Sequence, residues 1–127
     1  MIKKILLLSI IFLVTFGCRN KSELNMERGE YFYSVGEYEN ALLEYKKVVN
    51  LYSRDTNKLN HKTIKMVANA HHNLAVIYFR RGHESKDEIE KSLYMEKAEV
   101  EAKKSYDLYP KDTYKETWDS IKKELAG

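Results

Sequence analysis

The sequence predicts an all-α fold made of two helical hairpins and a C-terminal helix. Apolar residues recur with the 3.6-residue period of amphipathic helices in successive segments of the chain. The only proline is Pro110, and no run alternates between apolar and polar residues as strands do. Glycines such as Gly36 and Gly82 separate the helical series. These three observations favour helices packed on helices over a fold that contains a sheet.

Residues 1–17 have the three parts of an export signal. Two lysines come first, and the apolar run from Ile5 to Phe16 would form a helix of about 18 Å, too short for a hydrocarbon core of about 30 Å. Cys18 follows as the only cysteine of the chain, so it has no disulfide partner there. The segment resembles the lipobox of bacterial lipoproteins, although Thr15 and Phe16 depart from its usual residues. An ordinary secretory signal or a short membrane anchor is the alternative.

The lipoprotein resemblance implies that the signal is removed and that Cys18 is lipidated. Residues 18–22 would then form a tether, and residues 23–127 one folded domain. Acyl chains contribute about 0.8 kcal/mol per buried methylene, so two or three of them would hold the protein on a membrane. The formal net charge of +3 for the whole chain falls when the two lysines of the signal are removed. No basic stripe with interleaved aromatic residues is present, so nucleic acid is not an expected partner.

The first hairpin is predicted from two apolar series on either side of Gly36. The second series runs from Ala41 to Tyr52 and falls on one side of a helix. Gly36 is expected to make the turn, Ala41 to let the two helices approach, and Tyr45 to fill the space that small residues leave. Glu44 is expected on the outer face because it is charged.

The second hairpin is expected to begin near Ile64 and to turn at Gly82. Its second helix ends at Pro110, since proline cannot continue a helix. Ser85 and Glu88 have the spacing of a capping box and lie inside the insertion between Gly82 and Ala98. This insertion is therefore expected to be an elongated helix rather than a loop.

The last segment is a predicted helix that covers the open end of the second hairpin. Its apolar face is formed by Tyr114, Trp118, Ile121 and Leu125. Asp112 or Thr113 is the expected N-cap, and Glu116 would complete a capping box if Thr113 is the cap. Without this cover, the apolar face of the preceding helix would contact water.

The two hairpins resemble the tetratricopeptide repeat, a helical hairpin of about 34 residues with small residues at the helix crossing and a proline at its end. The matching residues are Gly29, Phe32, Gly36, Ala41 and Tyr45 in the first unit, and Leu74, Ala75, Tyr78, Gly82, Ala98, Leu108 and Pro110 in the second. Arg28 and Ser53 depart from the usual leucine and proline, and two insertions lie around residues 55–66 and 83–97. The resemblance implies a short α-solenoid.

In such a solenoid the first helix of each hairpin lines a concave groove that binds protein partners. Carried over position by position, the groove residues are Met26, Glu30, Tyr33, Ser34, Asn69, His72, Val76, Phe79 and Arg80. The family's clamp for C-terminal carboxylates has asparagine where this chain has Glu30 and Val76, so that specificity is not expected. Tyr33 and Phe79 are candidate anchors for a peptide or a partner helix. Packing against the final helix or against each other is the alternative.

Known catalytic and metal-binding motifs are absent from the sequence. The chain has no HExxH, no GxSxG, no paired cysteines and no phosphate-binding glycine loop. His71 and His72 are adjacent and leave a helix about 100° apart, which does not suit one metal ion, and His71 is expected in the core. His83 beside Glu84 and Asp87 is expected to lie in a solvated turn rather than to bind a metal. No enzymatic activity, cofactor or small-molecule substrate is expected.

Among lipid-anchored tetratricopeptide proteins, the chain is similar to the BamD-type lipoproteins of the outer-membrane β-barrel assembly machinery. The similarity lies in the hairpin of residues 25–49 soon after Cys18, in a repeat with an insertion, and in residues 109–126. Members of that family are usually longer, with more repeats. The resemblance implies a scaffold in the bacterial cell envelope, lipid-anchored at the outer membrane, that binds a β-barrel assembly protein. An envelope adaptor unrelated to barrel assembly is the alternative, and a small enzyme or metal-binding protein is a further one.

Overall fold

The computed structural model describes residues 20–53 and 59–127, and all regular structure within them is helical. The helices are α2 (Lys21–Ser34), α3 (Tyr38–Leu51), α4 (His61–Glu84), α5 (Glu88–Leu108) and α6 (Asp112–Ala126). No strand occurs in these two ranges, so the predicted all-α class is confirmed. The predicted signal and Cys18 lie outside the described residues.

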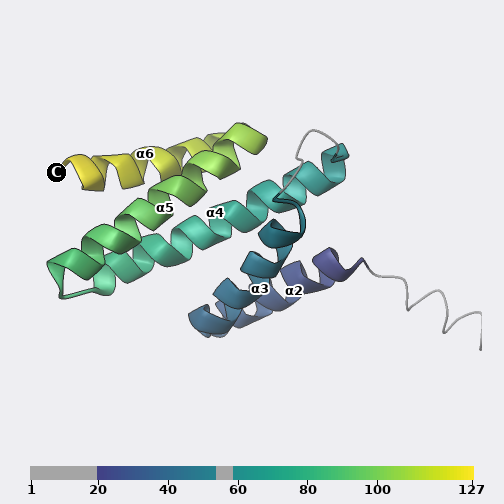
Figure 1. Ribbon diagram of the computed structural model, residues 1–127, viewed down its shortest axis with the longest axis horizontal. Coiled ribbons are helices and arrows are strands. Elements are labelled where there is room, and N and C mark those ends of the chain that lie inside the picture. The colour runs from purple at the N-terminus through teal and green to yellow at the C-terminus, as the bar shows by residue number, and fades with distance from the viewer. Residues whose placement is uncertain (1–19, 54–58) are drawn as a thin grey trace, which may run out of the picture.

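The helices form two antiparallel hairpins, α2 with α3 and α4 with α5, as Figure 1 shows. Helix α4 joins them, because it contacts α3 and α2 of the first hairpin as well as α5. Helix α6 lies along α5 and reaches α4. The arrangement is the predicted one of two hairpins and a C-terminal helix. In the described part of the chain, no helix is long and apolar enough to cross a membrane.

Small residues let the helices of the first hairpin approach closely, as predicted. Gly36 makes the turn with a φ of 80°, a conformation that side chains with a β-carbon rarely adopt. Ala41 is completely buried at the helix crossing, and the ring of Tyr45, only 1% exposed, lies against Gly29. Burial raises the pKa of Tyr45 to about 12. Glu44 departs from the prediction, since it is buried and its Oε1 accepts a hydrogen bond from Lys47.

Asparagine caps make α2 and α4 begin earlier than the apolar series indicated. Asn20 Oδ1 accepts a hydrogen bond from Ser22 N, so residues 21–22, which the sequence assigned to the tether, are helical. Asn60 Oδ1 accepts from Thr63 N, and α4 therefore begins at His61 rather than near Ile64. The first insertion thus lengthens α4, while residues 54–58 lie outside the described ranges.

In the second hairpin, Gly82 is a packing position rather than the turn. Helix α4 continues past it to Glu84, and a β-carbon on Gly82 would lie 2.7 Å from Cε of Met95 in α5. The second insertion is helical, as predicted, because α5 begins at Glu88. The longer helices of this hairpin have 24 and 21 residues, against 14 for each helix of the first.

The capping box predicted for Ser85 and Glu88 is wrong. Asp87 is the N-cap of α5, and its carboxylate accepts a hydrogen bond from Glu90 N at 2.9 Å. Ser85 Oγ donates to the Glu90 carboxylate at 2.6 Å and accepts from Asp87 N. Asp87 therefore caps α5 directly, because aspartate accepts as well as serine at a cap, and Ser85 Oγ bridges Asp87 N and the Glu90 carboxylate.

The cap predicted for α6 is also wrong, although the position of the helix is right. Lys111 is the N-cap and makes no side-chain capping bond, so Asp112 is the first helical residue, and Thr113 with Glu116 forms no box. An aspartate in the first turn still stabilises the helix through its dipole. Tyr114 and Ile121 of α6 are buried, and α6 contacts α5 and α4. These contacts confirm that α6 covers the second hairpin.

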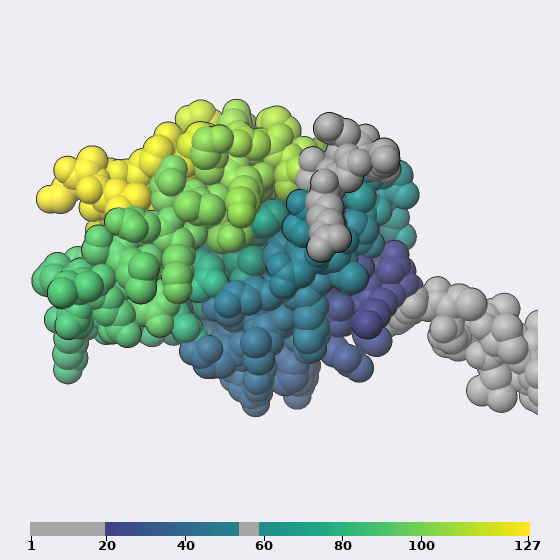
Figure 2. Space-filling view, viewed as in Figure 1, coloured from purple at the N-terminus to yellow at the C-terminus, as the bar shows by residue number. Residues whose placement is uncertain are grey.

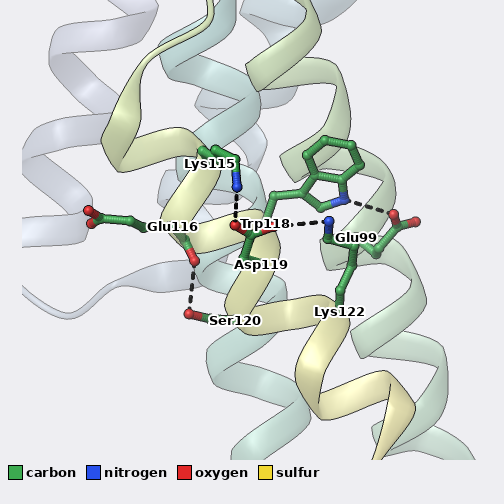
Figure 3. Close-up of polar contacts among 7 residues, drawn as sticks. All are labelled: Glu99, Lys115, Glu116, Trp118, Asp119, Ser120 and Lys122. Atoms are coloured by element: carbon green, nitrogen blue, oxygen red, sulfur yellow. Dashed lines mark hydrogen bonds and ion pairs between the residues drawn. The ribbon is translucent and has the colours of Figure 1, made fainter.

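Trp118 fastens α6 to α5, as Figure 3 shows. Its Nε1 donates a hydrogen bond to Glu99 Oε1 at 2.9 Å. Its ring also lies 5.8 Å from that of Tyr106 between centroids. Lys122 Nζ lies 4.2 Å from the indole centroid and 2.9 Å from the Asp119 carboxylate. These contacts combine burial of an aromatic ring with a satisfied indole N–H.

Candidate functional site

Part of the predicted groove is present between α2 and α4. A cavity of about 410 Å³ opens there, and Met26, Glu30 and Asn69 of the predicted residues line it. Its other lining residues are Glu23, Glu27, Lys62, Lys65 and Met66. Met26 is only 6% exposed and forms an apolar floor with Met66. The cavity is of the size that holds one or two side chains of a partner.

The two walls of this cavity carry opposite charges. Glu23, Glu27 and Glu30 follow one side of α2 at helical spacing, and Lys62 and Lys65 stand on α4. Lys62 Nζ lies 2.7 Å from Glu23 Oε1, and this hydrogen bond raises the pKa of Lys62. The pair is exposed and contributes little to stability. The cavity therefore has acidic side chains on the α2 wall and basic side chains on the α4 wall.

Tyr33 and Arg80 meet at the other end of α2, around Tyr38. The rings of Tyr33 and Tyr38 are in edge contact with centroids 5.3 Å apart, and Arg80 Cζ lies 4.3 Å from the Tyr38 centroid. Arg80 Nε also donates to Glu84 Oε1 at 2.9 Å. Arg80 and Tyr38 line a second cavity of about 440 Å³ beside the Gly36 turn. This aromatic and cationic cluster is the best-formed anchor among the predicted groove residues.

The remaining predicted groove residues are engaged within the fold. Phe79 is half-buried on the apolar core, and its ring lies 4.5 Å from His83. His72 packs against Tyr114 of α6 with ring centroids 4.7 Å apart, and burial followed by the charge of Lys111 lowers its pKa. Val76 is half-buried. Ser34 Oγ donates to Tyr31 O, a contact within α2.

The predicted groove is therefore two separate sites rather than one continuous surface. The ring of Tyr33 contacts that of Tyr38, and the ring of Phe79 contacts that of His83. Met26, Glu30 and Tyr33 are spaced i, i+4 and i+7 and lie on one face of α2. That face links the charged cavity at one end to the aromatic cluster at the other.

A largely buried histidine–glutamate contact that sequence reasoning missed lies on the opposite side of α4. His71 is in the core region as predicted, and its Nδ1 lies 2.5 Å from Glu101 Oε2 of α5. The pair lines a cavity of about 470 Å³ between α3, α4 and α5. No signal in the sequence indicates this contact, because residues 71 and 101 are 30 positions apart. Across the described ranges, no group of three or more histidine, cysteine, aspartate or glutamate side chains could hold a metal ion.

Comparisons of this chain with protein-family models, with curated proteins and with solved structures found no match. A functional assignment therefore depends on the residues and the geometry described above.

Proposed function

We propose that this protein is a membrane-anchored scaffold or adaptor of the bacterial cell envelope, which binds a protein partner along the face of α2 and α4. The observation that carries the proposal is the pairing of a charged cavity with a methionine floor and an aromatic–arginine cluster on one face of α2. A component of outer-membrane β-barrel assembly is the specific form of this role that we propose.

The chemistry of the two sites suits a helix or an extended segment of a partner protein. Methionine side chains adapt to the shape of an apolar partner group, as Met26 and Met66 would at the cavity floor. The acidic wall of α2 and the basic wall of α4 favour one orientation of a partner that carries both charges. Tyr33 and Arg80 are residue types that carry large shares of binding energy in interfaces. Helix α2 is about 21 Å long, so one partner helix of similar length reaches both sites.

A pull-down from solubilised membranes tests this proposal. The full chain should recover its partner, and the variant Glu30→Lys, Tyr33→Ala and Arg80→Ala should recover about tenfold less or worse. All three residues are exposed, so the variant is expected to fold. The matched control is Tyr31→Ala, Lys86→Ala and Glu96→Lys, three exposed residues outside the two sites.

Each outcome of the pull-down has a defined meaning. Recovery of a large β-barrel protein or of its periplasmic domains supports barrel assembly, whereas recovery of another envelope protein supports an unrelated adaptor. Undiminished recovery by the folded triple variant would remove the α2–α4 face from the proposal.

The membrane anchor is tested separately through Cys18. Labelled palmitate should enter the wild-type protein in bacterial cells and should not enter Cys18→Ala. Labelling that persists in Cys18→Ala would overturn the lipoprotein part of the proposal and leave the partner-binding part standing.

A further inference from the structure

A cationic cavity lies on the side of α2 away from the candidate groove. It has a volume of about 530 Å³ and lies between the start of α2 and the end of α3. Its lining residues are Lys21, Asn25, Arg28, Lys47, Asn50 and Leu51. Lys21, Asn25 and Arg28 are spaced i, i+4 and i+7 and share one face of α2. Figure 2 shows the first part of α2, in purple, beside the teal end of α3.

The cations of this cavity exceed the acids that engage them. Within the described part of the chain, Lys21 and Arg28 form no ion pair, and both are exposed. Lys47 Nζ donates to Glu44 Oε1 at 2.7 Å, the one carboxylate engaged by a lining residue. Only one of the three positive side chains is therefore paired with a carboxylate in the described residues, which leaves the cavity electropositive.

The cavity wall also contains a buried polar group that lacks a partner. Asn25 is 3% exposed, and its Nδ2 has no hydrogen-bond partner within the described residues. An unpaired buried donor destabilises a fold, so such groups are rare unless a ligand or water accepts from them. The unpaired carboxamide N–H₂ of Asn25 and two cations without an ion pair in the described residues therefore line one cavity, and its lining contains no carboxylate.

We propose that this cavity binds a phosphate-type anion. Arg28 offers a guanidinium fork that pairs with two phosphate oxygens, while Lys21 and Lys47 add positive charge at the rim. The start of α2 adds the positive end of its helix dipole, although Asn20 already accepts from Ser22 N. Asn25 lines the wall and would donate from its unpaired Nδ2 to a further oxygen after its side chain turns toward the cavity. A carboxylate has one charge and two oxygens, so it satisfies these donors less completely than a phosphate group does.

The phosphate group can come from a free phosphorylated compound or from a lipid headgroup. Lys21 stands three residues after Cys18, so a lipid anchor on Cys18 would hold the cavity close to the membrane surface. The lipid source therefore rests on the proposed membrane anchor, whereas phosphate recognition itself does not.

The test is a titration of the full chain in neutral detergent with inorganic phosphate at constant ionic strength, followed by NMR signals of the Asn25 side chain and of the α2 amides. A second titration adds the anionic lipid phosphatidylglycerol to the detergent, and a third uses acetate. We expect saturable shifts with phosphate, with phosphatidylglycerol or with both, and at least tenfold weaker binding of acetate.

Two variants and one control assign the shifts to the cavity. Arg28→Gln and Asn25→Leu should each weaken binding about tenfold or more, because each removes donors to the anion. Arg28 is exposed, so its variant is informative even if Asn25→Leu does not fold. The matched control Lys86→Gln removes an exposed cation elsewhere and should bind as the wild type does.

Saturation by phosphate identifies a free phosphate compound as a sufficient source, and saturation by phosphatidylglycerol alone identifies the headgroup. Both results support the proposal. Shifts that do not saturate, that acetate reproduces with equal affinity, or that persist unchanged in Arg28→Gln would overturn it. Since none of these readouts uses the protein partner or the Cys18 label, failure here leaves the proposed scaffold function untouched.

Discussion

The ring of Tyr45 in α3 occupies the space that a side chain at Gly29 in α2 would fill. A β-carbon at residue 29 would lie 2.5 Å from Cε1 of Tyr45 and 2.9 Å from its Cζ. The ring is 1% exposed and belongs to the buried core cluster that also contains Ala41 and Val48. The crossing of the first hairpin therefore depends on the absence of one methyl group.

Gly29→Ala should destabilise the protein. The new methyl group would overlap a rigid, buried ring, which costs about 1 to 3 kcal/mol, and the higher helix propensity of alanine offsets at most about 1 kcal/mol of it. A lower free energy of unfolding in urea, followed by far-UV circular dichroism, is the expected result.

Gly82→Ala is the matched control, because its nearest neighbour is the flexible end of Met95. Met95 can change rotamer, so this variant should be neutral or slightly more stable than the wild type. Equal stability of both variants would show that Tyr45 yields as readily as Met95, contrary to the packing described here.

The His71–Glu101 pair should be energetically coupled. Both side chains are largely buried, with 12% and 17% exposure, so removing Glu101 leaves His71 without this partner, while removing His71 leaves Glu101 only the longer contact with Lys104 at 3.9 Å. His71→Leu and Glu101→Leu should each cost about 1 to 3 kcal/mol, and the double variant should cost less than the sum. A double-mutant cycle in urea unfolding measures this coupling. Strict additivity of the two substitutions would mean that the pair contributes nothing as a pair.

His72 should make stability depend on pH. Its pKa lies below the ordinary value of 6.5 because burial between α4 and α6 opposes the charged form, and Lys111 adds to this effect. The unfolded chain therefore takes up a proton at a higher pH than the folded one. The contribution of neutral His72 to stability is complete above pH 6.5 and is lost as the pH falls toward the lower, folded-state pKa.

The variant His72→Phe keeps a ring against Tyr114 and removes the titration. Between about pH 7 and about pH 5, the wild type should lose more stability than this variant does. His83→Gln, which alters an exposed histidine, should follow the wild type. Parallel pH profiles for His72→Phe and the wild type would contradict the assignment.

The apolar series predicted the helices well because burial of one face is a local, periodic signal. Ala41, Tyr45 and the turn at Gly36 were predicted individually, and their roles are confirmed. The caps were harder, since Ser85, Asp87 and Asp112 all have side chains that can cap and stand within a few residues of the helix starts. Which one caps is decided by where the next helix docks, a property of the tertiary structure.

The candidate site was less predictable than the fold. Position-by-position transfer found Met26, Glu30 and Asn69 at one cavity, because these depend on the face of each helix. It did not separate His72 from the groove, since the depth to which α6 covers α4 is not encoded in the repeat pattern. Glu44 was placed on the outer face from its charge alone, and Lys47 one turn later makes its burial possible.

Trp118 should control the docking of α6. Trp118→Ala removes a half-buried ring, its hydrogen bond to Glu99 and its contact with Lys122, and it should lower stability by about 2 to 4 kcal/mol. Helix α6 packs mainly on α5, with a smaller contact to α4. Amide hydrogen exchange should therefore accelerate in α6 and stay unchanged in α2 and α3. Leu125→Ala, on the same face but 42% exposed, is the control and should change exchange little. Protection of α6 that survives Trp118→Ala would mean that Ile121 and Tyr114 alone hold the helix in place, and that the indole only shields their edge from water.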